Sequence, residues 1–202
     1  MHAAHPAVGV VRIGPNSIIQ TVGALEDWYG VAAAHAMLAR MGYAGLPEHL
    51  PSQKIDEAEF IAMLGALRAE LGMEQASRIL ARSGERTADY VRLNRVPAPI
   101  RAILPWLPSR MGLRIFLRAI SAHSWTFAGA GRFSFDVGGP GATLSLADCP
   151  ECRGIVADQP ICSYYRSCFE SLLRPLIDQR LQVRELACAA QGHPTCQFEV
   201  RL

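Results

Sequence analysis

The chain has 202 residues, of which 50% are hydrophobic and 19% charged, so it is long enough to bury the core of a full domain. Its 20 basic and 18 acidic residues give a net charge of only +2, which argues against a protein that binds nucleic acid by neutralising phosphates. The start, Met1 to Pro6, lacks the features of a secretion signal, and no apolar stretch is long enough to span a membrane. We therefore expect a cytoplasmic protein with an N-terminal segment at 1–23 and a single ligand-binding domain at 24–202.

The first half of the chain has the apolar periodicity of helices. Five segments show it: 24–43, 56–71, 74–93, 100–107 and 109–121. The segment 56–71, for example, has acidic residues in its first turn, where they favour a helix N-terminus. Within 74–93 we expect an interruption at Ser83-Gly84, and Pro97-Ala98-Pro99 separates the third helix from the fourth.

The second half changes to the alternating pattern of strands. Strands are expected at 125–128, 132–137 and 142–147, with the turn residues 138–141 between the last two. One more helix is expected at 161–177, followed by a closing hairpin of 181–187 and 196–202. This order predicts an α+β fold with a helical N-terminal half, in which helices pack on one antiparallel sheet.

All six cysteines lie after residue 148, which indicates that one local structure needs sulfur. In a reducing compartment such cysteines are more often metal ligands than disulfides. Cys188 and Cys196 stand at the two shoulders of the expected hairpin, with Glu185 one step back and Cys162 at the head of the preceding helix. These four could hold a structural zinc ion with no open coordination position. Because strict alternation would put Glu185 and Cys188 on opposite faces, this site requires a bulge near Ala187.

Three alternatives remain open from the residues alone. Cys149-Pro150-Glu151-Cys152 has the spacing of a zinc knuckle and could join Cys188 and Cys196 in a four-cysteine site. Cys149 and Cys152 could instead form a redox dithiol, although no βαβ pattern surrounds them. Any of these cysteines could also simply pack as a small buried hydrophobe.

The run from Glu185 through Cys188, Gly192 and Cys196 to Phe198 and Val200, with Cys162 before it, resembles the 4-vinyl reductase domain family. The resemblance is specific over about 100–202, and the lead-in Asp148-Cys149-Pro150-Glu151-Cys152 makes the chain similar to the members from bacteriochlorophyll biosynthesis. In the sensor relatives a zinc ion is held by Cys, Glu, Cys and Cys. The resemblance therefore implies zinc at Cys162, Glu185, Cys188 and Cys196, and it also suggests a homodimer.

The family label implies reduction of the 8-vinyl group of a chlorophyll precursor, which requires an electron donor. The sequence has neither a G-x-G-x-x-G motif after a strand nor a P-loop. We therefore expect a carrier or assembly factor that binds a Mg-porphyrin or a protochlorophyllide-type tetrapyrrole and contacts other enzymes of the pathway. The alternatives are the 8-vinyl reductase itself, using an external donor, and a small-molecule sensor.

A tetrapyrrole needs apolar surface, cations for its carboxylates and, where magnesium is present, an axial base. Five side chains are candidates for these roles: His35, Arg114, Arg118, His123 and Trp125. Arg114 and Arg118 are one helical turn apart and could clamp carboxylates. The ordinary alternatives are a cap at a helix end for His123, core packing for Trp125, helix packing around His35 and a solvated face for the two arginines.

Overall fold

The computed structural model describes residues 11–139 and 141–202, so the expectation made for Met1 to Pro6 lies outside the described residues. The helices are α1 (Asn16–Tyr29), α2 (Val31–Arg40), α3 (Glu57–Asn94), α4 (Ala98–Ile103), α5 (Ser109–Ala122), α6 (Trp125–Ala128) and α7 (Ser163–Leu173), with short 3-10 helices η1 (Leu104–Trp106) and η2 (Ala189–Gln191). Strands β1 (Arg12–Ile13) and β2 (Ile55–Asp56) form a small pair. The main sheet contains β3 (Arg132–Gly138), β4 (Gly141–Ala147), β5 (Gln182–Ala187) and β6 (Cys196–Arg201).

The main sheet is antiparallel, in the order β3-β4-β6-β5, and only one of its faces is covered by helices. Leu144 on β4 pairs with Phe198 on β6, and both side chains are fully buried against the helices. The intervening residues Ser145 and Gln197 pair on the other face and are partly exposed. This alternation of apolar and polar residues is typical of a sheet with one wet face, and it confirms the predicted α+β fold.

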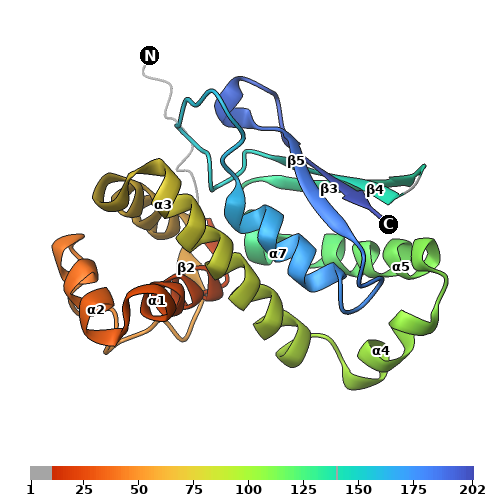
Figure 1. Cartoon of the computed structure of the whole chain (residues 1–202), viewed down its shortest axis with the longest axis horizontal. Helices are drawn as coiled ribbons and strands as arrows, with labels where there is room; N and C mark the ends of the chain where they lie inside the picture. The colour runs from red at the N-terminus through yellow and green to blue at the C-terminus, as the bar shows by residue number, and fades with distance from the viewer. Residues whose placement is uncertain (1–10, 140) are drawn as a thin grey trace, which may run out of the picture.

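Helix α7 lies between the sheet and α3 (Figure 1). Gly84 of α3 allows this close crossing, because a Cβ at that position would come within 2.2 Å of the Tyr164 carbonyl oxygen on α7. Aromatic rings fill the space between α7 and the sheet, where Phe169 packs edge-on against Phe198 with ring centroids 5.4 Å apart. The position of α7 is therefore fixed on both sides.

Several helix boundaries differ from those predicted. The helix expected at 24–43 begins at Asn16 and divides at Gly30, whose φ of 76° interrupts the helix. Helix α3 breaks at Gly72 (φ 76°, ψ 165°), which agrees with the predicted separation of 56–71 from 74–93. The interruption expected at Ser83-Gly84 is wrong, because the helix runs on through both residues and uses them for packing.

The segment 125–128 was expected to be a strand, but it forms the short helix α6. It follows α5 directly, and Tyr165 donates a hydrogen bond of 2.8 Å to the Phe127 carbonyl oxygen at its end. Tertiary packing therefore overrides the alternating pattern of this short segment. Among the residues that the structure describes, no helix combines the length and apolar character needed to cross a bilayer.

Candidate metal centre

Five cysteine side chains meet where the N-terminus of α7 approaches the β5–β6 hairpin. Cys162 precedes α7, Cys188 and Cys196 lie on the hairpin, and Cys149 and Cys152 come from the loop after β4. All five are buried, with at most 2% of their surface exposed. The Sγ atom of Cys162 is 3.5 Å from that of Cys196 and 3.7 Å from that of Cys188. Tetrahedral zinc with Zn–S bonds of about 2.3 Å would separate its sulfur ligands by about 3.8 Å.

Glu185 faces this cluster from β5. The register of β5 against β6 shifts between Glu185 and Ala187, which confirms the predicted bulge. As a result Glu185 pairs with the buried Phe198, while Leu186 is exposed. One carboxylate oxygen of Glu185 accepts a 2.9 Å hydrogen bond from the Cys162 N–H. The other oxygen, Oε1, is buried and has no hydrogen-bond partner.

The environment of Glu185 disfavours a free carboxylate. Burial, together with the charge of the neighbouring Cys188, raises the pKa of Glu185 to about 9. A buried oxygen without a partner is costly, and a cation beside it would both pair with it and stabilise its charge. The geometry around Glu185 therefore fits a metal ligand.

A second buried carboxylate, Glu151, holds the Cys149–Cys152 loop in place. It accepts hydrogen bonds from the N–H groups of Tyr164 (2.9 Å) and Tyr165 (3.2 Å) in the first turn of α7. Burial raises the pKa of Glu151 to about 8, although these two hydrogen bonds act in the opposite direction. Sequence reasoning missed this residue; an acidic side chain inside a Cys-x-x-Cys loop ahead of a helix was the available signal.

Two arginines support the same loop from outside. Arg68 on α3 donates to the Glu151 carbonyl oxygen at 2.7 Å. Arg153 donates to the Asp148 carbonyl oxygen at 2.6 Å and makes a two-pronged ion pair with the buried carboxylate of Glu57. The loop therefore approaches the cluster from a defined direction, although it contains neither helix nor strand.

Two groups of four donors in this region could hold a metal ion. One is the predicted set of Cys162, Glu185, Cys188 and Cys196, and the other is Cys149, Cys152, Cys162 and Cys196. In each group the donor atoms lie within 4.8 Å of one another. The knuckle cysteines were expected to combine with Cys188 and Cys196, but the second group contains Cys162 in place of Cys188. Thiolates with a carboxylate, or thiolates alone, suit zinc and similar soft divalent ions.

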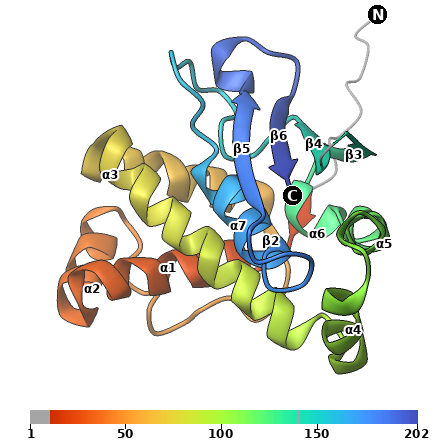
Figure 2. The same ribbon diagram turned by 45° about the vertical axis from the view of Figure 1, so that its right-hand side comes forward.

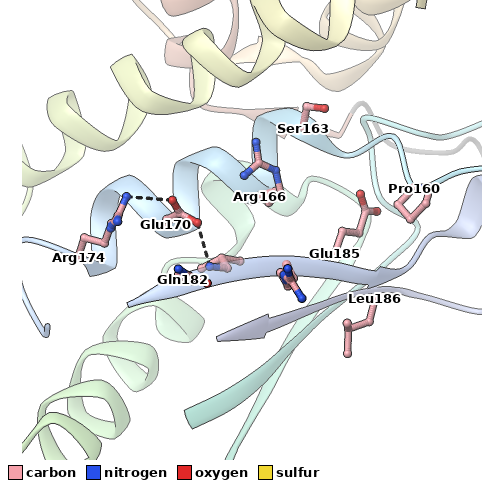
Figure 3. Close-up of a pocket in the computed structure, with 10 residues that line it drawn as sticks. Pro160, Ser163, Arg166, Glu170, Arg174, Gln182, Glu185 and Leu186 are labelled. Atoms are coloured by element: carbon pink, nitrogen blue, oxygen red, sulfur yellow. Dashed lines mark hydrogen bonds and ion pairs between the residues drawn. The ribbon is translucent and has the colours of Figure 1, made fainter. Parts of the chain in front are cut away.

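A groove of about 630 Å³ opens beside Glu185, between α7 and β5. Figure 3 shows Arg166, Glu170 and Arg174 on the helix side and Glu185 near Pro160 at one end. Glu170 bonds Arg174 at 3.1 Å and also accepts from the Val183 N–H at 2.9 Å. The lining is mainly charged and polar, so this groove lacks the apolar walls that a macrocycle requires.

Four of the five predicted ligand-binding residues lie close together in the chain, at the surface of α5 and α6. Arg114, Arg118, His123 and Trp125 are all exposed. The His123 Nδ1 atom lies 2.9 Å from the Ala119 carbonyl oxygen, and the Lys54 Nζ atom lies 3.8 Å from the centre of a Trp125 ring.

The fifth residue, His35, is on α2, which Figure 1 shows at the opposite side of the molecule from α5. Its Nε2 atom contacts Glu26 at 2.9 Å. The structure therefore does not bring His35 together with the other four, and none of the five lines either of the two cavities found among the described residues.

Comparison with known proteins identifies the family. Residues 143–202, which hold all six cysteines, match the 4-vinyl reductase domain. The bacteriochlorophyll synthase 23 kDa chain of Cereibacter sphaeroides is 36% identical over 189 residues, which cover 94% of this chain and 90% of the relative. The chain belongs to the family of these 23 kDa chains. The Rhodobacter capsulatus relative of the same name is 37% identical over 188 residues, covering 93% of this chain and 85% of the relative.

Solved structures share the fold at much lower identity. A heme-distortion structure of the H-NOX family superimposes with a TM-score of 0.60 at 12% identity, covering 94% of this chain and 95% of the other. The phenol-responsive sensory domain of the transcription activator PoxR, crystallised with phenol, gives 0.52 at 20% identity, covering 75% and 78%. At these identities the likeness concerns the fold alone.

Proposed function

We propose that this 23 kDa family member binds a chlorophyll-precursor tetrapyrrole and acts in bacteriochlorophyll biosynthesis as a carrier or assembly factor associated with 8-vinyl reduction. The names of its full-length relatives support the pathway, and H-NOX structures studied for their heme show that a related fold can hold a macrocycle. We further propose zinc for the cysteine centre, with a structural role, because four protein donors leave no position for substrate.

One surface carries the proposal of a tetrapyrrole ligand. It consists of α4, η1 and α5, and we call it the α4–α5 face. Helix α4 has no buried residue, and five large apolar side chains of the face are between 44% and 89% exposed: Ile100, Ile103, Trp106, Met111 and Ile115. Scattered exposed apolar residues are ordinary, but a group of this size marks a binding surface.

The charges of the α4–α5 face suit an acidic ligand. The chain has no acidic residue between Asp89 and Asp136, whereas arginine recurs throughout this stretch. On α5 the exposed arginines lie at successive turns, and an apolar strip with Met111 and Ile115 runs beside them. A planar apolar ring with carboxylate substituents would match both strips. The arginines of the α5 strip are Arg110, Arg114 and Arg118.

His123 is suited to act as the axial base in this arrangement. Its Nδ1 atom faces a carbonyl oxygen, which only accepts, so Nδ1 carries a proton and donates to Ala119. In the neutral ring Nε2 is then an acceptor, as a ligand of magnesium must be. Because His123 caps the C-terminus of α5, its ring is at the same end of the face as Trp125.

Titration of the purified protein with Mg-protoporphyrin or divinyl protochlorophyllide tests this proposal. We expect a shift of the pigment's main absorption band and quenching of tryptophan fluorescence. Replacing Arg114 and Arg118 together by Gln should weaken binding about 5- to 30-fold, since each exposed charge contact contributes roughly 0.5–1 kcal/mol. The matched control is Arg78→Gln, which removes an arginine from an exposed ion pair with Glu74 on α3.

Unchanged affinity in the double Arg variant and in Trp106→Ser would refute the α4–α5 face as the binding surface. Absence of binding by the wild-type chain would refute the proposed function as a whole. Incubation with divinyl substrate and NADPH, reduced flavin or reduced ferredoxin separates a carrier from a reductase, because reproducible loss of the 8-vinyl group would make the chain the enzyme.

A further inference from the structure

The two donor groups at the cysteine centre share two sulfur atoms. Cys162 and Cys196 belong to both groups, while Cys149 and Cys152 belong to one and Glu185 and Cys188 to the other. The shared Sγ atoms lie 3.5 Å apart. This is the arrangement of two tetrahedra with a common edge, in which each shared thiolate bridges two metal ions.

We propose that the centre binds two divalent metal ions of the zinc class, bridged by the thiolates of Cys162 and Cys196. The first ion is held by the predicted set with Glu185 and Cys188. The second is held by the bridging pair with Cys149 and Cys152, a role that goes beyond the single-zinc site implied by family resemblance. On binding, thiols lose their protons to solvent and each ion acquires four donors.

The sulfur positions on the second side fit this assignment. The Cys149 Sγ atom is 3.6 Å from that of Cys162, and the Cys152 Sγ atom is 3.3 Å from that of Cys196. On the first side the Cys188 Sγ atom is 3.7 Å from Cys162 and 3.9 Å from Cys196. Both sides are therefore close to the separation of about 3.8 Å expected for two thiolates on one zinc ion.

Use of the buried donors also favours two ions over one. A single ion in either set would leave two buried ligand-type side chains with no metal: either Cys149 and Cys152, or Glu185 and Cys188. In the first set the orphaned Glu185 Oε1 points to an ion, and in the second the loop is held against the cluster by Glu151, Arg68 and Arg153. Two ions use all six donors.

The charge of a two-ion centre is also moderate. Five thiolates and one carboxylate carry six negative charges, and two dications reduce the total to about −2. Backbone donors help to offset the remainder, since the Ala189 N–H lies 3.3 Å from the Cys196 Sγ atom and the Cys162 N–H binds Glu185. A single dication with all six donors ionised would leave about −4 in a buried site, which is far less favourable.

Metal content per chain tests the proposal directly. We expect elemental analysis and native mass spectrometry of the protein, purified with reductant and zinc, to give two ions per chain. The double variants Cys149→Ser with Cys152→Ser, and Glu185→Gln with Cys188→Ser, should each retain one. The control Cys168→Ser should retain two, because Cys168 belongs to neither donor group.

One ion in the wild-type chain, or a Cys149–Cys152 disulfide in its place, would overturn the proposal, and this count decides even where a variant fails to fold. Two ions in the Cys149/Cys152 variant would also overturn it, because the second ion would then lie elsewhere. Cobalt loading tests the bridge itself. Two ions that share thiolates should be magnetically coupled, so the cobalt spin signal should fall as the second equivalent binds, and a doubling of the signal would refute bridging.

Discussion

The close crossing of α3 and α7 gives the sharpest prediction for stability. Changing Gly84 to Ala places a methyl group 2.2 Å from the Tyr164 carbonyl oxygen and 2.9 Å from the Cys168 nitrogen. Real Cβ atoms essentially never approach closer than 3.0 Å, so the two helices must separate by roughly 0.8 Å, the difference between 3.0 and 2.2 Å. Both obstructing atoms belong to the backbone and cannot turn aside.

The size of the effect follows from the contacts that such a separation weakens. A gap of this width forfeits a quarter to a half of each contact, so on the order of 40 atom pairs at about 0.15 kcal/mol each lose about 2 kcal/mol. Overpacking of cores costs about 1–3 kcal/mol, which agrees with this figure. Alanine regains about 1 kcal/mol of helix propensity, leaving a net loss of about 1–2 kcal/mol.

Thermal unfolding of two variants checks this reasoning. At about 2–4 °C per kcal/mol for a chain of this size, Gly84→Ala should lower the Tm by about 2–8 °C. The matched control is Gly65→Ala on the same helix, where a Cβ meets nothing within 4 Å. That variant should raise the Tm by about 1–4 °C through propensity alone. A Tm for Gly84→Ala equal to or above that of the wild type would refute the argument.

Three further outcomes are expected. Burial raises the pKa of Glu151 from its usual 4.5 to about 8, so the stability that protonated Glu151 provides should be lost as pH rises through about 8; the urea midpoint of the metal-loaded wild type should fall from pH 6 to 9, more steeply than that of Glu151→Gln, and a rising midpoint would contradict this. Removing Arg153 leaves the buried Glu57 carboxylate without its ion-pair partner, so Arg153→Ala should cost about 2–4 kcal/mol in denaturant unfolding; adding Glu57→Gln should recover part of that loss, whereas simple additivity would show that the pair is not coupled. Chelation should lower the Tm by at least about 10 °C and zinc should restore it, because binding energy of a structural ion is folding energy; loss of metal without a change in Tm would exclude a structural role.

The sequence predicted the layout of elements well but could not distinguish the roles of individual glycines. Gly72 and Gly84 both interrupt a helical pattern, and local chemistry treats them alike. The structure separates them, because Gly72 adopts a φ of 76° that breaks the helix, while Gly84 stays helical and lets α7 approach. Only the partner helix, which follows some eighty residues later, determines the second role.

The metal centre was predictable for a different reason. Residues near a hairpin have few arrangements, so the spacing of Glu185, Cys188 and Cys196 sufficed to predict the bulge that the structure contains. The Cys149–Cys152 loop has no regular structure, and its direction depends on Glu151 and on arginines that are remote in the chain. Pattern alone therefore assigned it to the wrong partners.

The positions of the two proposed sites assign them different tasks. The hairpin loop with η2 lies at one end of the molecule and α4 at the other in both views (Figures 1 and 2). At the metal end Cys162 gives α7 no side-chain cap, and the carboxylates of Glu151 and Glu185 bind its first N–H groups instead. Because α7 also packs against α3 and the sheet, ligand loss at this end should loosen the fold, whereas substitutions at Arg114 and Arg118 remove only exposed charge. Pigment affinity and thermal stability should therefore respond to separate sets of variants.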